Sequence, residues 1–162
     1  MRIIKFRGKK SSNGDWIYGS LVSSKDIDPA IYFQTGNGMV KTMDWVYVKG
    51  DTVGQFTSLY DKNGKEIYEG DVLRSDEYPY SCIGDKERDN YYAVVYYCEE
   101  GACFGTVTAK NPISDVGGIS DGILDEVERE KMKNFEVIGN VHDLEWKQYR
   151  EYFQDEEEEQ HP

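Results

Sequence analysis

The stretch TVGQFTSLYDKNGKEIYEGDVL, residues 52–73, decides how this chain folds. Asn63-Gly64 lies near its centre between apolar runs, and both residue types tolerate the positive φ angles that tight hairpin turns require. A second corner follows at Glu69-Gly70-Asp71, where the glycine permits the bend and the aspartate can accept hydrogen bonds from turn amides. A strand leads away from this corner. The stretch therefore predicts turns within a β-sheet and carries no catalytic chemistry.

Alternating or β-rich runs predict further antiparallel strands along the chain. They cover residues 2–8, 16–22, 30–34, 39–48, 71–74, 91–98, 103–109 and 135–141. Helix is expected only late: residues 121–133 have helix-forming composition, although a charged loop fits them equally, and Asp143 can cap a helix through Phe153. Residues 75–90 and 111–120 are interpreted as loops. The predicted fold class is mainly β.

Length and composition favour one domain of a polar protein. The 162 residues are 38% apolar and 14% aromatic, which suits half-buried strands. We expect a domain over residues 1–153, divisible into subdomains 1–50 and 51–141 with a helix at 143–153, and a disordered acidic tail at 154–162. No apolar run approaches the roughly 20 residues of a membrane helix, and Met1-Arg2 opens no signal peptide. Three cysteines make no disulfide framework, so a cytoplasmic protein is expected.

Charge is distributed unevenly along the chain. Residues 1–74 carry 11 basic and 9 acidic side chains, whereas residues 75–162 carry 8 basic and 22 acidic ones, and the formal net charge is -12. So negative a protein repels nucleic-acid phosphates, which disfavours nucleic acid as a partner. The charge leaves open a basic protein partner or mimicry of a nucleic acid, beside the simpler interpretation that it keeps the chain soluble.

The acidic tail is expected to contribute nothing to folding. Its five consecutive carboxylates repel one another, and it has no apolar anchor beyond Phe153. Deleting residues 154–162 should therefore leave the thermal unfolding midpoint almost unchanged, as followed by circular dichroism. A loss of several degrees would instead mean that the tail docks on a basic surface. The candidate surface is formed by Arg2, Lys5, Arg7, Lys9 and Lys10.

Groups for catalysis are scarce. His142 and His161 are the two histidines, and no serine lies in a nucleophile-elbow context. His142 beside Asp143 can act as an oriented base, but a histidine at a helix start is more often a surface group. The neighbouring carboxylates Glu99-Glu100 and Asp125-Glu126 do not converge on one metal ion unaided. We therefore expect no catalytic residue, no metal and no cofactor.

Two cysteines flank a predicted four-residue hairpin loop. Cys98 and Cys103 would then be direct cross-strand neighbours whose side chains touch. A redox-sensitive pair, or a zinc site completed by Cys82 and His142, is one interpretation. The sequence has no CxxC pair that would supply the second half of a zinc site. This favours the alternative, in which the two cysteines are small apolar side chains in a sheet.

Aromatic side chains recur along the predicted strands. An aromatic face can hold a proline-rich peptide or single-stranded bases, but base stacking normally needs a basic groove, and only residues 2–10 supply one. Most of these rings are therefore interpreted as core residues or cross-strand pairs. They are Trp16, Tyr18, Trp45, Tyr47, Phe56, Tyr60, Tyr68, Tyr91, Tyr92, Tyr96 and Tyr97.

The block VGQFT at 53–57 followed by LYDKNGKEIYEGD at 59–71 resembles the signature of the YopX-like proteins of phages and prophages. MRIIKFR at 1–7, WIYG at 16–19 and FEVIGNV at 135–141 resemble the opening and closing strands of that family. The resemblance implies an origin in a mobile element, a small antiparallel SH3-like β-barrel fold and no known activity. Its signature positions are interpreted as structural: Gly54, Gln55, Asn63, Gly64, Gly70, Asp71 and Gly139.

Taken with the lack of a catalytic constellation, the resemblance predicts a non-enzymatic prophage accessory protein that binds another protein, or a second copy of itself. The alternative is an acidic mimic of nucleic acid that occupies a basic site on a host enzyme. These two hypotheses differ in salt dependence, because a mimic should lose affinity steeply as salt rises. A metal-dependent enzyme that uses carboxylates of residues 75–130 is the third hypothesis.

Overall fold

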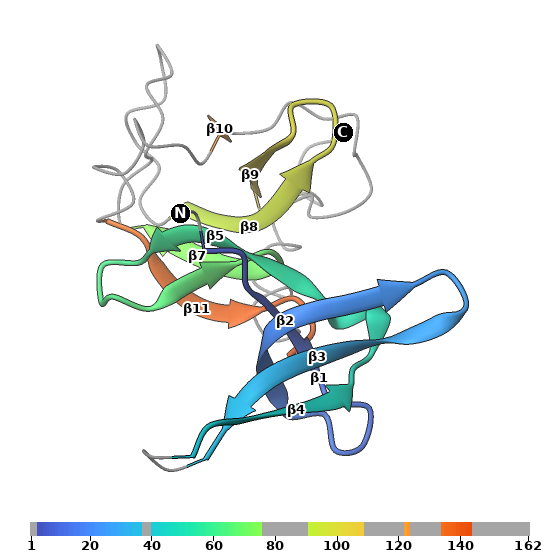
Figure 1. Ribbon diagram of the computed structural model, residues 1–162. Helices are drawn as coiled ribbons and strands as arrows, with labels where there is room; N and C mark the ends of the chain where they lie inside the picture. Colours follow the sequence, from blue (N-terminus) through green and yellow to red (C-terminus); the bar gives the residue numbers. More distant parts are fainter. Residues whose placement is uncertain (1–2, 37–39, 76–90, 109–121, 124–133, 144–162) are drawn as a thin grey trace, which may run out of the picture. The chain divides into compact units, whose positions relative to one another are not determined.

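The computed structural model describes residues 3–36, 40–75, 91–108, 122–123 and 134–143 (Figure 1). Within these ranges the regular structure is strand, apart from one short 3-10 helix, and the strand pairings are antiparallel. The predicted mainly β, antiparallel fold is confirmed. No helix in these ranges has the length and apolar character needed to cross a bilayer.

The chain divides into two compact units, residues 1–58 and 59–162. The first unit is a sheet whose strands follow the order β4-β3-β2-β1-β5 (Figure 1). Its elements are β1 (Phe6–Lys9), β2 (Trp16–Ser24), β3 (Ile27–Thr35), β4 (Thr42–Tyr47), the 3-10 helix η1 (Gly50–Thr52) and β5 (Gly54–Tyr60), whose last two residues belong to the second unit.

Register assigns each side chain of the first unit to one of two faces, because directly paired residues lie on the same side of a sheet. Ser20 pairs with Tyr32, and Tyr32 pairs with Trp45. These three residues define the outer face. The alternate positions define the inner face, where Ile31 is fully buried and Val48 is 2% exposed. Apolar burial on this inner face is what stabilises the unit.

The end of β4 returns to the end of β1. Lys10 and Val48 form an isolated antiparallel bridge, and the amide of Ser11 donates to the carbonyl of Tyr47 at 3.0 Å. Gly8 makes this approach possible, since a Cβ there would lie 3.0 Å from the Cβ of Val48. These contacts curl the sheet around its inner face. They do not amount to a closed barrel among the described residues, so the SH3-like barrel stays a prediction.

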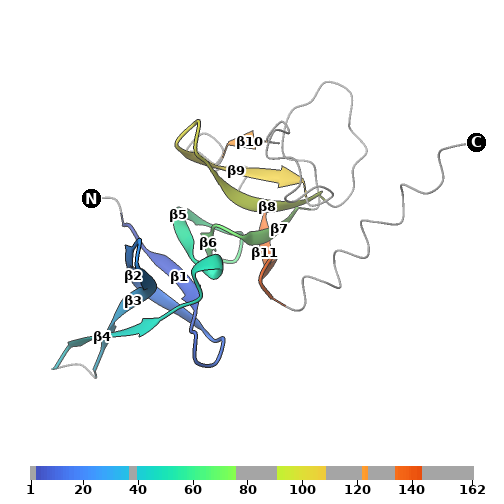
Figure 2. The ribbon, with the colours of Figure 1, turned by 90° about the vertical axis from the view of Figure 1, so that its right-hand side faces the viewer.

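The second unit is built on a five-stranded sheet in the order β10-β9-β8-β7-β11 (Figure 2). A hairpin formed by the end of β5 and β6 precedes this sheet. The strands are β6 (Glu66–Tyr68), β7 (Asp71–Ser75), β8 (Tyr91–Cys98), β9 (Cys103–Thr108), β10 (Gly122–Ile123) and β11 (Glu136–Asn140). One apolar cluster forms the core of the unit: Leu59, Ile67, Leu73, Ala93, Val95, Phe104, Phe135 and Val137.

Late in the chain the structure departs from one expectation. The composition of residues 121–133 predicted a helix or, equally, a charged loop, but Gly122-Ile123 pairs with Gly105-Thr106 as a short strand. A neighbouring strand edge supplies hydrogen-bond partners that override a weak local preference for helix. The remainder of that segment, the predicted helix at 143–153 beyond Asp143, and the tail at 154–162 lie outside the described residues.

Candidate functional site

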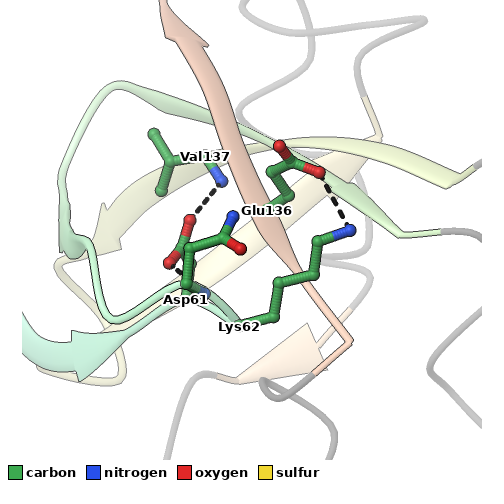
Figure 3. Close-up of polar contacts among 5 residues, drawn as sticks. Asp61, Lys62, Glu136 and Val137 are labelled. Carbon is green, nitrogen blue, oxygen red and sulfur yellow. Dashed lines mark hydrogen bonds and ion pairs between the residues drawn. The ribbon is translucent and has the colours of Figure 1, made fainter.

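The signature hairpin is organised around the carboxylate of Asp61 (Figure 3). One oxygen accepts the backbone amides of Asn63 and Lys65 at 2.8 and 2.9 Å, which holds the turn closed. The other oxygen accepts the amide of Val137, 76 positions later in the chain, at 3.0 Å. Asp61 is only 6% exposed. Its side chain therefore joins the hairpin tip to β11 through charge-assisted hydrogen bonds.

Lys62 adds two further links to the same strand. Its amide donates to the carbonyl of Phe135 at 2.8 Å, and its ammonium lies 2.9 Å from the carboxylate of Glu136 (Figure 3). Both partners of the ion pair are about one-third exposed, so solvent screens it and it contributes little free energy. The backbone bond is the firmer of the two links.

The second corner of the signature is fixed by Asp71 and Asn140. Asp71 is 1% exposed and accepts the amide of Tyr68 at 2.8 Å, and its other oxygen lies 3.5 Å from the amide nitrogen of Asn140. Gly70 has φ +79°, and a Cβ there would lie 3.1 Å from that Asn140 nitrogen. Only glycine meets both conditions at no cost. The corner is thus a packing point rather than a reaction centre.

The other signature positions also lie in the sheets. Gly54 and Gln55 begin β5 and pair with Arg7 and Phe6. Gly64 ends the hairpin turn at φ +79°, where its amide donates to the carbonyl of Asp61 at 2.9 Å. Gly139 lies in β11 at the register shift opposite β7. None of these positions brings reactive side chains together, so a functional surface is to be sought elsewhere.

Exposed apolar side chains gather on the first unit. Of the eleven large apolar side chains exposed among the described residues, nine belong to residues 1–58. Five of them lie on the outer face, which is where a sheet normally places polar groups. They are Tyr18 at 42% exposed, Val22 at 55%, Met43 at 65%, Trp45 at 47% and Tyr47 at 44%. Exposed apolar side chains gathered on one face of a sheet are typical of an interaction surface.

Three rings form the centre of this surface, and we call Tyr32, Trp45 and Tyr47 the ring cluster. Tyr32 and Trp45 are paired residues whose rings stack with centroids 6.2 Å apart and planes 23° apart. Trp45 and Tyr47 meet edge to face at 5.0 Å and 83°. Such geometries are favourable for aromatic pairs and hold the rings in place. The cluster is therefore preorganised on a rigid element.

Cations occupy the other end of the outer face. The guanidinium of Arg7 lies 4.7 Å from the ring centroid of Trp16, the ammonium of Lys9 lies 5.2 Å from the same ring, and that of Lys5 lies 5.6 Å from Tyr18. These are cation–π distances. Arg7 is only 5% exposed, so this cation is a packed part of the sheet. Trp16 and Tyr18 thus each have a cation of the chain near the ring, although Tyr18 remains 42% exposed.

Most rings were expected to be core residues or cross-strand pairs. In the structure the rings fall into a buried group and an outward-pointing group. Phe56 and Tyr68 are buried, whereas Trp45, Tyr47 and Tyr18 point outward. Tyr32 was not among the aromatic candidates, and the stacking of Arg7 on Trp16 was not foreseen. Pairing register, which alternation alone does not give across hairpins, decides which rings meet.

The cysteine pair has the predicted neighbour relation. Cys98 pairs with Cys103 across the β8–β9 hairpin, and the two are not joined by a disulfide. Cys82 lies outside the described residues, and the backbone amide of His142, just after β11, donates a hydrogen bond to the side-chain oxygen of Asn140 at 3.0 Å. Glu99 and Glu100 are exposed in the hairpin loop, and Asp125-Glu126 lies outside the described ranges. In the part of the chain that is described, no three His, Cys, Asp or Glu side chains gather as metal ligands.

Cys98 and Cys103 are expected to remain free thiols that bind no metal, because two ligands in a sheet do not complete a tetrahedral zinc site. Elemental analysis of the purified protein should find no stoichiometric zinc, and thiol titration under native conditions should detect reactive groups. A stoichiometric metal, or a fall in thermal stability on adding a chelator, would contradict this expectation.

Together, the two antiparallel sheets, the carboxylate-braced hairpin and the outward aromatic face define an antiparallel β-sheet protein with exposed apolar side chains on one face of its first unit. The YopX protein family matches residues 5–144 of the chain. The chain therefore belongs to the YopX family. Among solved structures it is similar to protein EF1440 from Enterococcus faecalis, with 19% identity and a TM-score of 0.50, over 88% of this chain and 95% of that one. At that identity the likeness concerns the fold. None of the curated proteins compared with the chain matches it significantly.

Proposed function

We propose that this protein is a non-enzymatic accessory protein of a prophage or other mobile element, and that it binds a partner protein through the outer face of its first unit. The observation that carries the proposal is the concentration of exposed Tyr, Trp, Met and Val side chains on β2 and β4 of that face. Aromatic residues and methionine are the types enriched at protein interfaces. The mobile-element origin rests on membership of the YopX family.

The ring cluster has the properties of an energetic centre for such an interface. Binding energy usually concentrates in a few large residues, with Trp and Tyr prominent among them. Trp45 is half exposed, so its uncovered surface becomes available to a partner, while stacking on Tyr32 keeps its ring ordered. A preorganised side chain loses less conformational entropy on binding than a free one.

The curvature of the first sheet supports the outer face as the binding surface. The Lys10–Val48 bridge and the bond from the Lys49 amide to the Lys9 carbonyl favour an SH3-like barrel in which the inner face is the core. In that arrangement the outer face remains the one that a partner can reach. We infer a cytoplasmic location from the cysteine content, which makes no disulfide framework.

The alternative function, mimicry of a nucleic acid, is favoured by a different observation. The second unit carries 11 basic and 26 acidic side chains, whereas the first carries 8 and 5. A mimic would engage a basic enzyme through the second unit, and its affinity would fall steeply with salt. Binding through the apolar outer face would depend on salt much less.

A differential pull-down from host lysate tests the proposal. The full-length protein is compared with Trp45→Ala, and with Tyr97→Ala as a matched control from the second unit, since Tyr97 is a ring of similar exposure at 41%. We expect at least one captured protein whose recovery falls about tenfold with Trp45→Ala, as for a typical hot-spot residue, and is unchanged with Tyr97→Ala. Capture that is insensitive to Trp45 but abolished by moderate salt would contradict the proposal and favour the mimic.

A further inference from the structure

The cysteine pair of the β8–β9 hairpin lies on the side of the second sheet opposite its main core (Figure 1). Phe104 belongs to the main apolar cluster and pairs with Tyr97. Successive residues of a strand point to opposite faces, so the next pair along, Cys98 and Cys103, faces away from that cluster. Both cysteines are partly exposed. Packing in the main core therefore does not account for the pair.

The hairpin loop brings the two thiols together. A Cβ at Gly101 would lie 2.9 Å from the Sγ atom of Cys103 and 3.6 Å from the Sγ atom of Cys98, so both sulfurs lie next to one point of the loop backbone. Gly101 does not have a positive φ. Its lack of a side chain is therefore explained by the close approach of the sulfurs rather than by the turn conformation.

The register of the hairpin suits a bridge between these sulfurs. Directly paired residues of antiparallel strands have Cα atoms roughly 4.5–5.5 Å apart. Disulfides join residues whose Cα atoms are about 4.4–6.8 Å apart. Cys98 and Cys103 are such a pair, so neither strand has to move for their thiols to be joined.

We propose that Cys98 and Cys103 form a reversible redox site that exchanges with a low-molecular-weight disulfide. The thiolate of one cysteine attacks a sulfur of that disulfide and expels one thiolate, which leaves a mixed disulfide on the protein. The other cysteine, deprotonated in turn, attacks the cysteine sulfur of the mixed disulfide and expels the second thiolate. The protein gives up two electrons and two protons, and the small disulfide takes them up as two thiols.

The placement of the pair favours a reversible switch over a permanent structural bridge. A disulfide stabilises a fold mainly by closing a loop in the unfolded chain, and this loop holds only the four residues between Cys98 and Cys103. Exposed disulfides are also the ones that are reduced most readily. The four loop residues are exposed, and both cysteines are partly so. In the cytoplasm proposed above, the pair would stay reduced until such disulfides accumulate.

The test treats the reduced, full-length protein with bis(2-hydroxyethyl) disulfide, a neutral reagent that the acidic second unit does not repel. Remaining thiols are blocked by alkylation, and a glutamate-specific protease separates the two cysteines by cutting after Glu99 or Glu100. Mass spectrometry should then find two peptides joined through Cys98 and Cys103, which dithiothreitol releases.

Single-cysteine variants and the unfolded chain show whether the fold pairs the thiols. Cys98→Ser and Cys103→Ser should each retain one mixed disulfide with the reagent, which the wild type releases when it closes the bridge. Cys82→Ser is the matched control and should behave like the wild type. In urea the wild type should retain about tenfold more of the mixed disulfide than the folded protein does, because oriented groups react much faster than flexibly tethered ones.

Three results would overturn the inference: a wild type that retains as much mixed disulfide as the single variants, a bridge that maps to Cys82, or closure that is equally efficient in the unfolded chain. Mapping the bridge in the wild type decides the question even if a serine variant fails to fold, which circular dichroism would reveal. The pair belongs to the second unit. These results therefore do not depend on whether a partner protein binds the outer face of the first unit.

Discussion

Replacing Asp61 by alanine is expected to lower the free energy of unfolding by about 3 to 5 kcal/mol, measured by urea denaturation followed by circular dichroism. The change removes the acceptor for three backbone amides, those of Asn63, Lys65 and Val137. Water can hydrate the two amides in the turn. The buried amide of Val137 cannot be hydrated, so it carries the largest share of the loss.

Two variants distinguish this bracing role from a general effect of charge. Asp61→Asn keeps one oxygen for the turn but sets an NH2 group against the Val137 amide, so it should fall between the wild type and Asp61→Ala. Asp26→Ala removes an exposed carboxylate from another turn and should change stability by less than about 0.5 kcal/mol. If Asp61→Ala proved as mild as Asp26→Ala, the carboxylate would not be what joins the hairpin to β11.

Replacing Gly70 by alanine is expected to destabilise the protein by about 2 to 4 kcal/mol, twice or more the loss for Gly64→Ala. Both glycines have φ +79°, so an alanine at either position meets the same backbone strain of about 1 to 2 kcal/mol. They differ in surroundings. A Cβ at Gly64 has nothing within 4 Å, whereas a Cβ at Gly70 lies 3.1 Å from the Asn140 side chain and 3.5 Å from Val141.

The excess loss at Gly70 therefore measures the contact with Asn140, which is 2% exposed and has little room to move. A double-mutant cycle isolates it: in an Asn140→Ala background, Gly70→Ala should cost nearly the same as Gly64→Ala. Equal losses for the two glycines in the wild-type background would show that Asn140 adapts freely, and that φ alone requires glycine at this corner.

Local sequence features predicted most of the strands because a strand is a short-range pattern. The aromatic and β-branched run at 91–98 and the Asn63-Gly64 turn are both signals of a few residues, and the strand and the turn both lie where they were expected. The two-residue strand at 122–123 has no such pattern, since its pairing with β9 comes from a strand edge brought near by the fold. Helical composition is a weak local preference, and at Gly122-Ile123 pairing with this edge took its place.

The candidate surface was only partly visible in the sequence. Trp45 and Tyr47 were noted as aromatic residues of a strand, but alternation alone does not say which face of that strand is covered. Tyr32 drew no attention, and the sheet register brings it onto Trp45. Likewise, the sequence shows Arg7 only as a charged residue in the first predicted strand. The register of β1 and β2 places it beside Tyr18, and its guanidinium lies over the neighbouring ring of Trp16.

By itself the sequence determined the antiparallel β class, the position of the signature turns, the charge asymmetry and the resemblance to the YopX family, because each of these depends on residue types and short spacings. Tertiary structure decided the rest. Asp61 meets Val137 across 76 positions, and the ring cluster forms from residues of β3 and β4. Such contacts depend on which strands become neighbours and in what register, and that choice is made by burial of the whole sheet rather than by any local run of residues.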